Sequence, residues 1–389
     1  MRVIDLFSGA GGFSEGFKRA GFDILVANEI DPMIAKTHSI NHPETLMINI
    51  GIEEFADNID EIINDKLDKM EDTDRANEIR NNINNVDIII GGPPCQGFSM
   101  AGARNRQSNS FMEDPRNYLF RHYFRVIQHF EPTYFIMENV QGLESMKGGE
   151  ILREIMSLFE DENNFNNGRY YLSRKIISAD ELGVPQARKR LIIIGSKLES
   201  INIDEGIARV KERLNIPNQV TIEEAISDLN YLESGEGEFE SDYRNEPLSD
   251  YQIARRVESN KLYNHIGPRH NEIALDRIRR IEQGQNWQDL EERDEIKSVH
   301  SGAYGRLEWD NQSTTITTRF DTPSAGRVIH PQRHRALTPR EAARIQSFDD
   351  SFVFYGNKTS VGKQIGNAVP PLVAEVLANI IRDDMEIRR

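Results

Sequence analysis

The 389-residue sequence contains one cysteine, Cys95, and no long apolar run. A single thiol excludes an intramolecular disulfide and any zinc site built from several cysteines. Without a run of about 18 or more apolar residues, the sequence predicts no membrane span. The first residues, MRVIDLFSGAGGF, also lack the basic start and the cleavage site of a signal peptide. We therefore expect a cytoplasmic protein that makes no membrane contact.

Basic residues are also scarce, with 47 Lys and Arg against 63 Asp and Glu. Taken alone, this excess of acid argues against a nucleic-acid partner, because phosphate binding needs Lys and Arg. The charge is unevenly distributed, however. Residues 49–78 carry eleven acids and three bases, whereas residues 301–345 hold seven arginines against four acids. The arginine-bearing segment can face a polyanion, and an ordinary mixed surface is the alternative interpretation.

The first 195 residues alternate short apolar runs with amphipathic stretches, the pattern of a βαβ sheet. Runs such as VDIII and RLIII are apolar throughout, as in strands covered by helices on both faces. The predicted strands are residues 2–6, 23–27, 86–90, 134–137, 170–176 and 190–194. The predicted helices are residues 14–20, 32–40, 54–69, 118–130 and 150–160. The acidic stretch 53–85 is expected to form a solvated helical hairpin.

The composition changes after Gly195. Residues 197–300 are polar and short of strand signals, and TTITT at 314–318 predicts one strand. The tail GNAVPPLVAEVLANIIRDDM predicts an amphipathic helix that begins near Pro370 and needs a core for its apolar face. We expect this helix to pack on the first domain. The predicted domains are therefore residues 1–197 together with 356–389, and a smaller domain of residues 198–355.

Two strand ends in the first domain carry polar signals that are weak by themselves. Glycines in DLFSGAGGF, directly after a strand, allow backbone N–H groups to approach a ligand closely. Gly9, Gly11 and Gly12 do not match the dinucleotide fingerprint, so a plain tight turn is an open alternative. Glu29 follows the second strand, where a carboxylate can accept hydrogen bonds from both ribose hydroxyls. A solvated strand-end acid or a neighbour of a helix N-cap is the alternative there.

The segment VDIIIGGPPCQGFS is a sharper signal, because it places Cys95 after an apolar strand, two glycines and two prolines. Two prolines make a rigid turn, which a cysteine of the core would not need. FIMENV is a second apolar strand, and it ends in Glu138. A thiol and a carboxyl group at neighbouring strand ends indicate a nucleophile with a general acid. Arg188 and Arg190 in QARKR can hold Glu138 and a substrate carbonyl or phosphate.

In this order, these elements resemble the motif series of the DNA (cytosine-5)-methyltransferase family of bacterial type. The resemblance is carried by DLFSGAGGF, NEID, GGPPCQGFS, MENV, QARKR, RALTPREAARIQSF and GKQIGNAVPP. It implies an α/β fold, a Rossmann-like S-adenosyl-L-methionine-dependent methyltransferase sheet with helices on both faces. It also implies a smaller, irregular DNA-recognition domain, since residues 197–320 match the family only in position.

The resemblance implies a covalent mechanism. The thiolate of Cys95 would add to carbon 6 of a flipped cytosine in duplex DNA, while Glu138 donates a proton or hydrogen bond to the ring nitrogen. Carbon 5 would then accept the methyl group of S-adenosyl-L-methionine, leaving S-adenosyl-L-homocysteine. Arg188 and Arg190 would support Glu138 and the flipped nucleotide. The resemblance implies no metal.

The same resemblance implies residues that bind the cofactor and DNA. Glu29 would bind the ribose and Ile30 the adenine. Asn49 stands where the family usually has an acid, and its amide oxygen can still accept a hydrogen bond. The other implied cofactor residues are Phe7, Gly9, Ala10, Gly12, Ile50, Pro94, Leu119, Asn367, Ala368 and Val369. The implied DNA contacts are Gln96, Ser99, Arg104, Arg106, Arg116 and Arg319, five of them in or beside a loop, 97–117, that resembles the family's mobile loop.

The implied protein is a monomeric, nucleoid-associated enzyme whose partner is double-stranded DNA, with a separate restriction endonuclease as a further partner. Methylation of tRNA by the same family is one alternative, and residues 198–330 favour duplex DNA over it. A non-catalytic DNA-binding protein is another, against which Cys95, Glu138, Arg188 and Arg190 together argue. A nicotinamide-dependent oxidoreductase fits poorly, because the glycine spacing is wrong.

Overall fold

The computed structural model describes residues 1–94, 118–291, 294, 296 and 301–388. The chain forms two compact units. The first comprises Met1–Ser178, Lys189–Asn215 and Ala374–Arg389, and the second Ala179–Arg188 and Ile216–Val373. The division into a catalytic domain, 1–197 with 356–389, and a target-recognition domain, 198–355, assigns functions to the ranges and stays a prediction. None of the helices in the described ranges is long and apolar enough to cross a bilayer.

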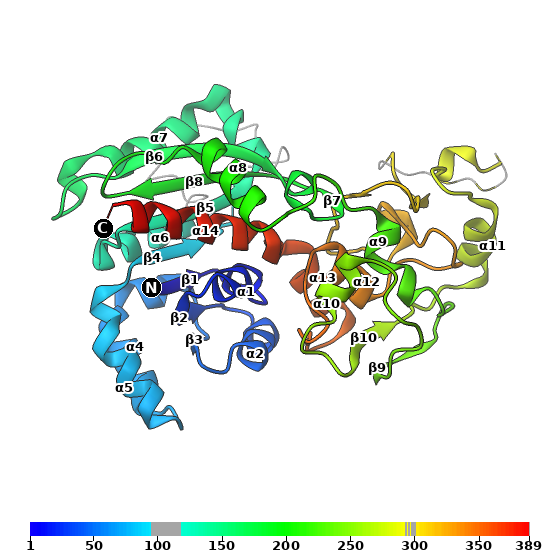
Figure 1. Cartoon of the computed structure of the whole chain (residues 1–389), viewed down its shortest axis with the longest axis horizontal. Helices are drawn as coiled ribbons and strands as arrows, with labels where there is room; N and C mark the ends of the chain where they lie inside the picture. The colour runs from blue at the N-terminus through cyan, green and yellow to red at the C-terminus, as the bar shows by residue number, and fades with distance from the viewer. Residues whose placement is uncertain (95–117, 292–293, 295, 297–300, 389) are drawn as a thin grey trace. The chain divides into compact units, whose positions relative to one another are not determined.

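A seven-stranded sheet lies at the centre of the first unit (Figure 1). Its strands are β1 (Arg2–Leu6), β2 (Asp23–Asn28), β3 (Leu46–Ile48), β4 (Ile88–Gly91), β5 (Tyr134–Val140), β6 (Tyr171–Ser178) and β8 (Lys189–Ser196). Their order is β3-β2-β1-β4-β5-β8-β6. The first five strands in this order run parallel, and β8 is antiparallel to both of its neighbours. The order reverses between β1 and β4, the position at which open α/β sheets bind ligands.

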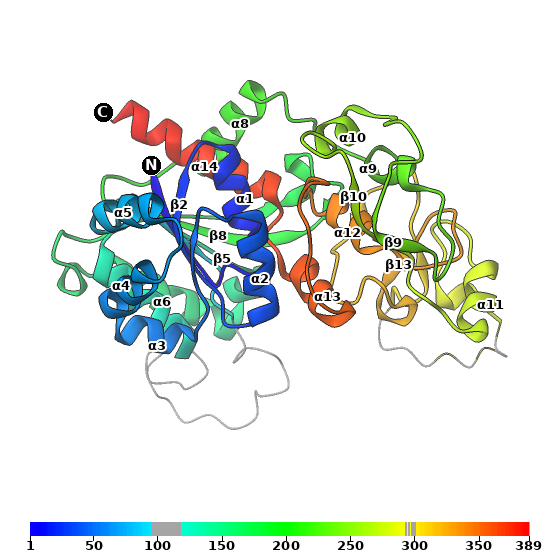
Figure 2. The same ribbon diagram turned by 90° about the horizontal axis from the view of Figure 1, so that it is seen from below.

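Helices cover both faces of this sheet, which confirms the predicted fold class. Figure 2 shows α8 and α14 on one side of the sheet and α3, α4 and α6 on the other. The helices of this unit are α1 (Gly12–Arg19), α2 (Pro32–Asn41), α3 (Ile52–Asp57), α4 (Ile59–Asp68), α5 (Thr73–Asn82), α6 (Tyr118–Phe130), α7 (Glu150–Glu160), α8 (Ile203–Arg213) and α14 (Pro371–Ile387), the last from Ala374 onward. As predicted, α14 packs on the first unit, where the Tyr134 hydroxyl donates to Asp384 Oδ2 at 2.8 Å.

All six predicted strands are present, and two features differ from the prediction. The strand β3 was not predicted, because LMI is too short to show a period. The acidic stretch 53–85 is indeed helical, and α4 and α5 form a helical pair (Figure 1). It is not simply solvated, however. One face of the pair, with Ile63, Leu67 and Ile79, is buried in the core of the first unit.

The second unit has short elements and little sheet, as the sequence predicts. They are β7 (Gln186–Ala187), α9 (Ile222–Ile226), β9 (Gly237–Ser241), α10 (Asp250–Arg255), β10 (Leu262–Ile266), α11 (Glu272–Arg280), β11 (Gly305–Arg306), β12 (Ser313–Thr314), β13 (Arg327–Ile329), α12 (Pro339–Ile345) and α13 (Lys358–Asn367). The strand predicted for TTITT is reduced to β12, which pairs with β7.

Four of the seven arginines in residues 301–345 are buried in the second unit, so their charge does not face a polyanion. Arg344 lies between two buried carboxylates, Asp228 at 2.5 Å and Asp350 at 2.6 Å. Arg335 makes two hydrogen bonds of 2.7 Å to Glu341. Arg306 and Arg340 are also buried. The sequence gives the number of guanidinium groups in a segment, but it does not show which of them bind carbonyls and carboxylates inside the unit.

Candidate functional site

Most of the candidate residues of the first unit follow the carboxyl ends of parallel strands, at one edge of the sheet. Phe7 follows β1, Glu29 follows β2, Asn49 follows β3 and Gly92 follows β4. Glu138 lies near the carboxyl end of β5, two residues before its last residue, Val140. This edge includes the position between β1 and β4 at which the strand order reverses. The described residues therefore gather the predicted polar groups where an α/β sheet binds nucleotide-like ligands.

The glycine turn after β1 has a backbone that ordinary residues rarely adopt. Phe7 itself has a positive φ of 55°, a conformation that costs about 1–3 kcal/mol at a non-glycine residue. Gly11, with φ at 102°, could not carry a side chain, since a Cβ there would lie 2.8 Å from the His42 ring. Gly9 also has positive φ, but a Cβ on it would meet no atom within 4 Å. The turn is thus packed on the side of Gly11 and open at Gly9.

Glu29 ties the glycine turn to the end of β2. Its Oε2 accepts a hydrogen bond from the backbone N–H of Gly9 at 3.1 Å, and its Oε1 accepts one from Asp31 at 2.8 Å. Burial raises the pKa of Glu29 above its ordinary value. Each carboxylate oxygen has two lone pairs, so both retain capacity to accept from a ligand. The carboxylate is not merely solvated, and the alternative of a neighbour of a helix N-cap agrees with its bond to Asp31, the N-cap of α2. Ribose binding by Glu29 stays a prediction.

Asn49 is fixed by the strand end beside it. Its Nδ2 donates to the carbonyl of Glu29 at 2.7 Å and to that of Ile30 at 3.1 Å. The amide nitrogen is therefore engaged, and the oxygen is the group that remains to accept from a ligand. The neighbouring Ile30 is 67% exposed, whereas Ile50 packs against the core.

A buried polar chain beneath the glycine turn did not emerge from the sequence. The Ser14 hydroxyl donates to Asp5 Oδ2 at 2.7 Å and lies 3.2 Å from His38 Nε2. Burial raises the pKa of Asp5 to about 7 and lowers the pKa of His38 well below its ordinary value. The only signal in the sequence was an acid inside an apolar strand, Asp5 in RVIDL, and a serine just after the glycines.

On the β4 side of the position where the strand order reverses, Glu138 is held against the segment that follows β4. Arg190 Nε lies 2.8 Å from Glu138 Oε1, with both side chains mostly buried. Asn139 Nδ2 donates to the carbonyl of Pro93 at 3.1 Å. A Cβ on Gly92 would lie 3.2 Å from Glu138 Oε2. The acid thus lies beside the GGPP turn, residues 91–94, which directly precedes Cys95 in the sequence.

Arg188 has its described contacts inside the second unit. Its guanidinium is buried and donates to the carbonyls of Ile316 at 3.2 Å and Gly366 at 3.0 Å. Gly366 needs to be glycine, since a Cβ there would lie 2.4 Å from the backbone nitrogen of Thr318. The predicted support of Glu138 by Arg190 agrees with the ion pair, and the same role for Arg188 stays a prediction.

The remaining candidates are spread over both units. In the first unit, Ala10 and Gly12 are buried in the glycine turn, Leu119 is half-buried against the core, and Pro94 is exposed. In the second unit, Arg319 and Asn367 are exposed, while Ala368 and Val369 are half-buried after α13. Six predicted residues lie outside the described part of the chain, namely Cys95, Gln96, Ser99, Arg104, Arg106 and Arg116.

Together, the sheet order, the glycine turn and the strand-end carboxylates define a Rossmann-like α/β unit, a class in which nucleotide-like cofactors bind at this edge of the sheet. Comparison with known proteins identifies its family. The family model described as C-5 cytosine-specific DNA methylase matches residues 1–383, and the chain belongs to this family. The predicted DNA (cytosine-5)-methyltransferase is confirmed at this level, and the family generally uses S-adenosylmethionine.

Two similar relatives are bacterial methyltransferases that the chain matches over most of their length. The chain is 34% identical to the Type II methyltransferase M.DdeI of Desulfomicrobium norvegicum, over 98% of this chain and 88% of that protein. It is also 34% identical to the Type II methyltransferase M1.HphI of Haemophilus parahaemolyticus, over 98% and 86%. A similar solved structure is that of a protein described as a DNA modification methyltransferase encoded within an E. coli prophage. It has a TM-score of 0.70 and 26% identity, and 99% of each chain is covered.

Proposed function

We propose that this chain methylates carbon 5 of a flipped cytosine in a specific sequence of duplex DNA, with Cys95 as the nucleophile and Glu138 as the acid. The observation that carries the proposal is the placement of Glu138. Arg190 holds one carboxylate oxygen at 2.8 Å, and the other lies beside Gly92, which is three residues before Cys95 in the sequence. The hydrogen bond from Asn139 to Pro93 fixes the same turn.

In this proposal the chain's own groups make cytosine reactive. The Cys95 thiolate adds to carbon 6 and forms a carbon–sulfur bond, while Glu138 delivers a proton or hydrogen bond to the ring nitrogen beside the amino-bearing carbon. The added electron density then resides at carbon 5. Arg190 keeps the carboxyl group in one orientation through a charge-assisted hydrogen bond. Loss of the carbon 5 proton and of the thiol restores the aromatic ring.

The strand ends of the first unit fit S-adenosyl-L-methionine. Gly9 faces open space, Glu29 retains lone pairs for two ribose hydroxyls, and the free amide oxygen of Asn49 can accept from the adenine amino group. The exposed Ile30 offers an apolar surface to the adenine ring. When bound, the cofactor supplies a methyl group on a sulfonium, which makes it an electrophile for carbon 5 of the activated cytosine.

Specific DNA recognition is assigned in this proposal to residues 198–355, with the exposed Arg319 contacting the backbone. Two relatives carry the name Type II methyltransferase. These names support a role for this chain as the modification partner of a restriction endonuclease, whose cleavage it would block by methylating the recognition sequence.

The test uses purified full-length protein and methyl-labelled S-adenosyl-L-methionine. Label should enter duplex DNA and not tRNA, and Cys95→Ser should abolish its incorporation. Bisulfite sequencing of DNA from expressing cells should then show converted and protected cytosines, with protection in one sequence context. Incorporation into tRNA in preference to DNA, or label on adenine, would overturn the proposal.

A further inference from the structure

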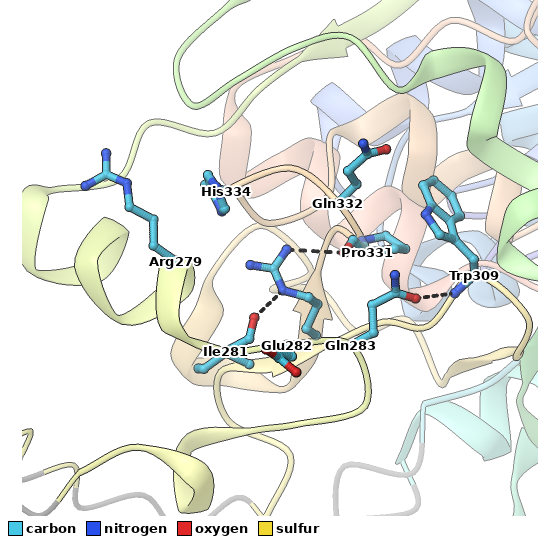
Figure 3. A pocket seen from close by; sticks show the side chains of 9 residues that line it. Arg279, Ile281, Glu282, Gln283, Trp309, Pro331, Gln332 and His334 are labelled. Atoms are coloured by element: carbon cyan, nitrogen blue, oxygen red, sulfur yellow. Dashed lines mark hydrogen bonds between the residues drawn. The ribbon is translucent and has the colours of Figure 1, made fainter.

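A cavity in the second unit is not used by the proposed chemistry. It has a volume of about 650 Å³ and lies between α11, the segment after β11 and the segment after β13 (Figure 3). Its lining residues are Arg279, Ile281, Glu282, Gln283, Arg306, Trp309, Pro331, Gln332 and His334. Six of the nine lining residues have polar or charged side chains, and the orientation of two of their amides can be assigned.

The floor of the cavity carries a positive charge. Arg306 is buried, and its guanidinium donates only to carbonyls, including those of Ile278 and Ile281 at 2.7 and 2.6 Å. No carboxylate of the described residues forms an ion pair with it. Burial lowers the pKa of Arg306 to about 10, so it remains protonated at neutral pH. The floor therefore favours electron-rich atoms, although four of the five N–H groups of Arg306 already donate to carbonyls.

A hydrogen bond from a backbone N–H fixes the orientation of the Gln283 amide. The backbone N–H of Trp309 lies 3.0 Å from one end of this amide and can only donate, so that end is the oxygen (Figure 3). The Gln283 Nε2 group is consequently turned away from Trp309. It has no partner among the described residues.

A similar chain of contacts orients Gln332. Arg333 Nε, which can only donate, lies 2.8 Å from Asn230 Oδ1. The Asn230 amide nitrogen therefore faces Gln332 and donates to its Oε1. This leaves the Gln332 Nε2 group as a donor, again without a partner in the described ranges.

The side chains that can reach a ligand are thus mainly donors. Besides the two amide groups, they include the exposed guanidinium of Arg279, which forms a loose ion pair of 3.9 Å with Glu272. Trp309 adds an indole N–H and is packed edge-on against His330, with ring centroids 5.2 Å apart. Glu282 is the one carboxylate of the lining. A ligand for this cavity must present several acceptors close together.

We infer that Gln283 and Gln332 recognise a guanine in the major groove of the DNA target, an inference that rests on the proposed function. Guanine is the base that presents two adjacent acceptors, O6 and N7, to that groove. Backbone phosphates also carry acceptors. The charges of Arg279 and Arg306 attract them, whereas the carboxylate of Glu282 repels them and the two oriented amides are neutral, which favours the base edge.

The test compares the wild type with Gln283→Glu and Gln332→Glu, each in the full chain. Both substitutions keep the volume and the accepting oxygen while they replace the free donor by an acceptor. Gln288→Glu, an exposed glutamine outside the cavity lining, is the matched control. Each protein is used to select bound duplexes from a random-sequence library. Thermal unfolding of each variant, expected within a degree or two of the wild type, shows that it is folded.

The wild type and the control should enrich guanine at one position of the selected site. Each cavity variant should lose that preference by about tenfold or more and shift toward cytosine, whose N4 amino group is a donor. Replacing the guanine by 7-deazaguanine, which lacks N7, should weaken the wild type and leave the affected variant unchanged. Uniform weakening of all sequences with a shallower salt dependence would indicate a phosphate contact and overturn the inference, as would unchanged selection.

The selection measures binding, so it separates this inference from methyl transfer. A wild type that selects a guanine-containing site but transfers no methyl group would contradict the proposed catalysis and keep the cavity assignment. Methylation by the wild type, together with an unchanged site preference in both variants, would contradict the cavity assignment and keep the proposed catalysis.

Discussion

Arg190 Nε lies 2.8 Å from Glu138 Oε1 at the edge of the central sheet. The two residues come from antiparallel neighbours, since β5 and β8 pair Val140 with Arg190. Glu138 is therefore the diagonal neighbour of Arg190, close enough for long side chains to meet. Because the pair orients the acid beside the GGPP turn, each of its members can be tested separately from cofactor binding.

Glu138→Gln should lower kcat by about 100-fold or more, because an amide cannot deliver a proton. Its affinity for S-adenosyl-L-methionine, measured by calorimetry, should stay within about twofold. Arg190→Ala should lower kcat by about tenfold to 100-fold through misplacement of the acid. Lys189→Ala, at the exposed neighbouring position of β8, is the control and should keep wild-type kcat. A main effect of Glu138→Gln on cofactor affinity would show that the acid assignment is wrong.

Substitution of Arg344 should lower the stability of the protein, whereas substitution of Arg319 should weaken DNA binding. Arg344→Ala removes the guanidinium that lies between the buried Asp228 and Asp350, which should cost about 3–5 kcal/mol in the free energy of unfolding. Arg319→Ala removes an exposed charge and should change that free energy by less than about 0.5 kcal/mol. Its effect should instead be weaker DNA binding with a smaller salt slope. Urea denaturation and titration of DNA at several salt concentrations check both, and a stable Arg344→Ala protein would contradict the first.

Asp5→Asn should change the pH dependence of stability. Burial raises the pKa of Asp5 from 3.8 to about 7, so the folded chain binds this proton more tightly than the unfolded chain. The stability it contributes is fully present below pH 3.8 and is lost as the pH rises through about 7. Asparagine retains an oxygen that can accept from the Ser14 hydroxyl, and it carries no charge at any pH.

The Asp5→Asn protein should therefore match the wild type in Tm near pH 4 and exceed it at pH 8. Glu61→Gln, which changes an exposed carboxylate, is the control and should show no such divergence. His38 and His42, whose pKa values are lowered by burial, contribute equally to both proteins in this comparison. A wild type that is the more stable protein at pH 8 would show that the carboxylate is needed in its charged form.

Asn49→Asp should weaken cofactor binding, although the family usually has an acid at this position. The carboxylate would face the carbonyl oxygens of Glu29 and Ile30, which now accept from the amide at 2.7 and 3.1 Å. Losing these bonds should cost about tenfold in affinity for S-adenosyl-L-methionine. Calorimetric titration checks this, with the exposed Asn167→Asp as control. Tighter binding of S-adenosyl-L-methionine by Asn49→Asp would contradict this account of the Asn49 amide.

The sequence predicted the sheet of the first unit because its strands are apolar throughout and its turns carry Gly and Pro. VDIII and RLIII became β4 and β8, and Tyr118–Phe130 and Glu150–Glu160 are helices with the predicted bounds. Motif order also predicted that Glu138 lies at a strand end, where Arg190 now holds it. Local composition suffices for these features, since each depends on residues close in the sequence.

Contacts between distant residues could not be predicted in this way. The burial of Arg344 depends on Asp228, 116 residues away, and Arg188 is bound by carbonyls 128 and 178 residues away. The chain from Asp5 through Ser14 to His38 depends on packing that no local pattern reports. The donors of the Gln283 and Gln332 cavity likewise follow from partners on other segments.

The most direct measurement of the central claim is mass spectrometry of the protein after reaction with duplex DNA that carries 5-fluorocytosine at the target position, in the presence of S-adenosyl-L-methionine. Fluorine cannot leave carbon 5 as a proton does, so an adduct formed at carbon 6 would persist. Cys95 is the only cysteine of the chain, which makes a sulfur-linked adduct unambiguous. The account predicts one nucleotide attached to Cys95 and none in Cys95→Ser. Normal methylation of ordinary duplex without any adduct at Cys95 would contradict it.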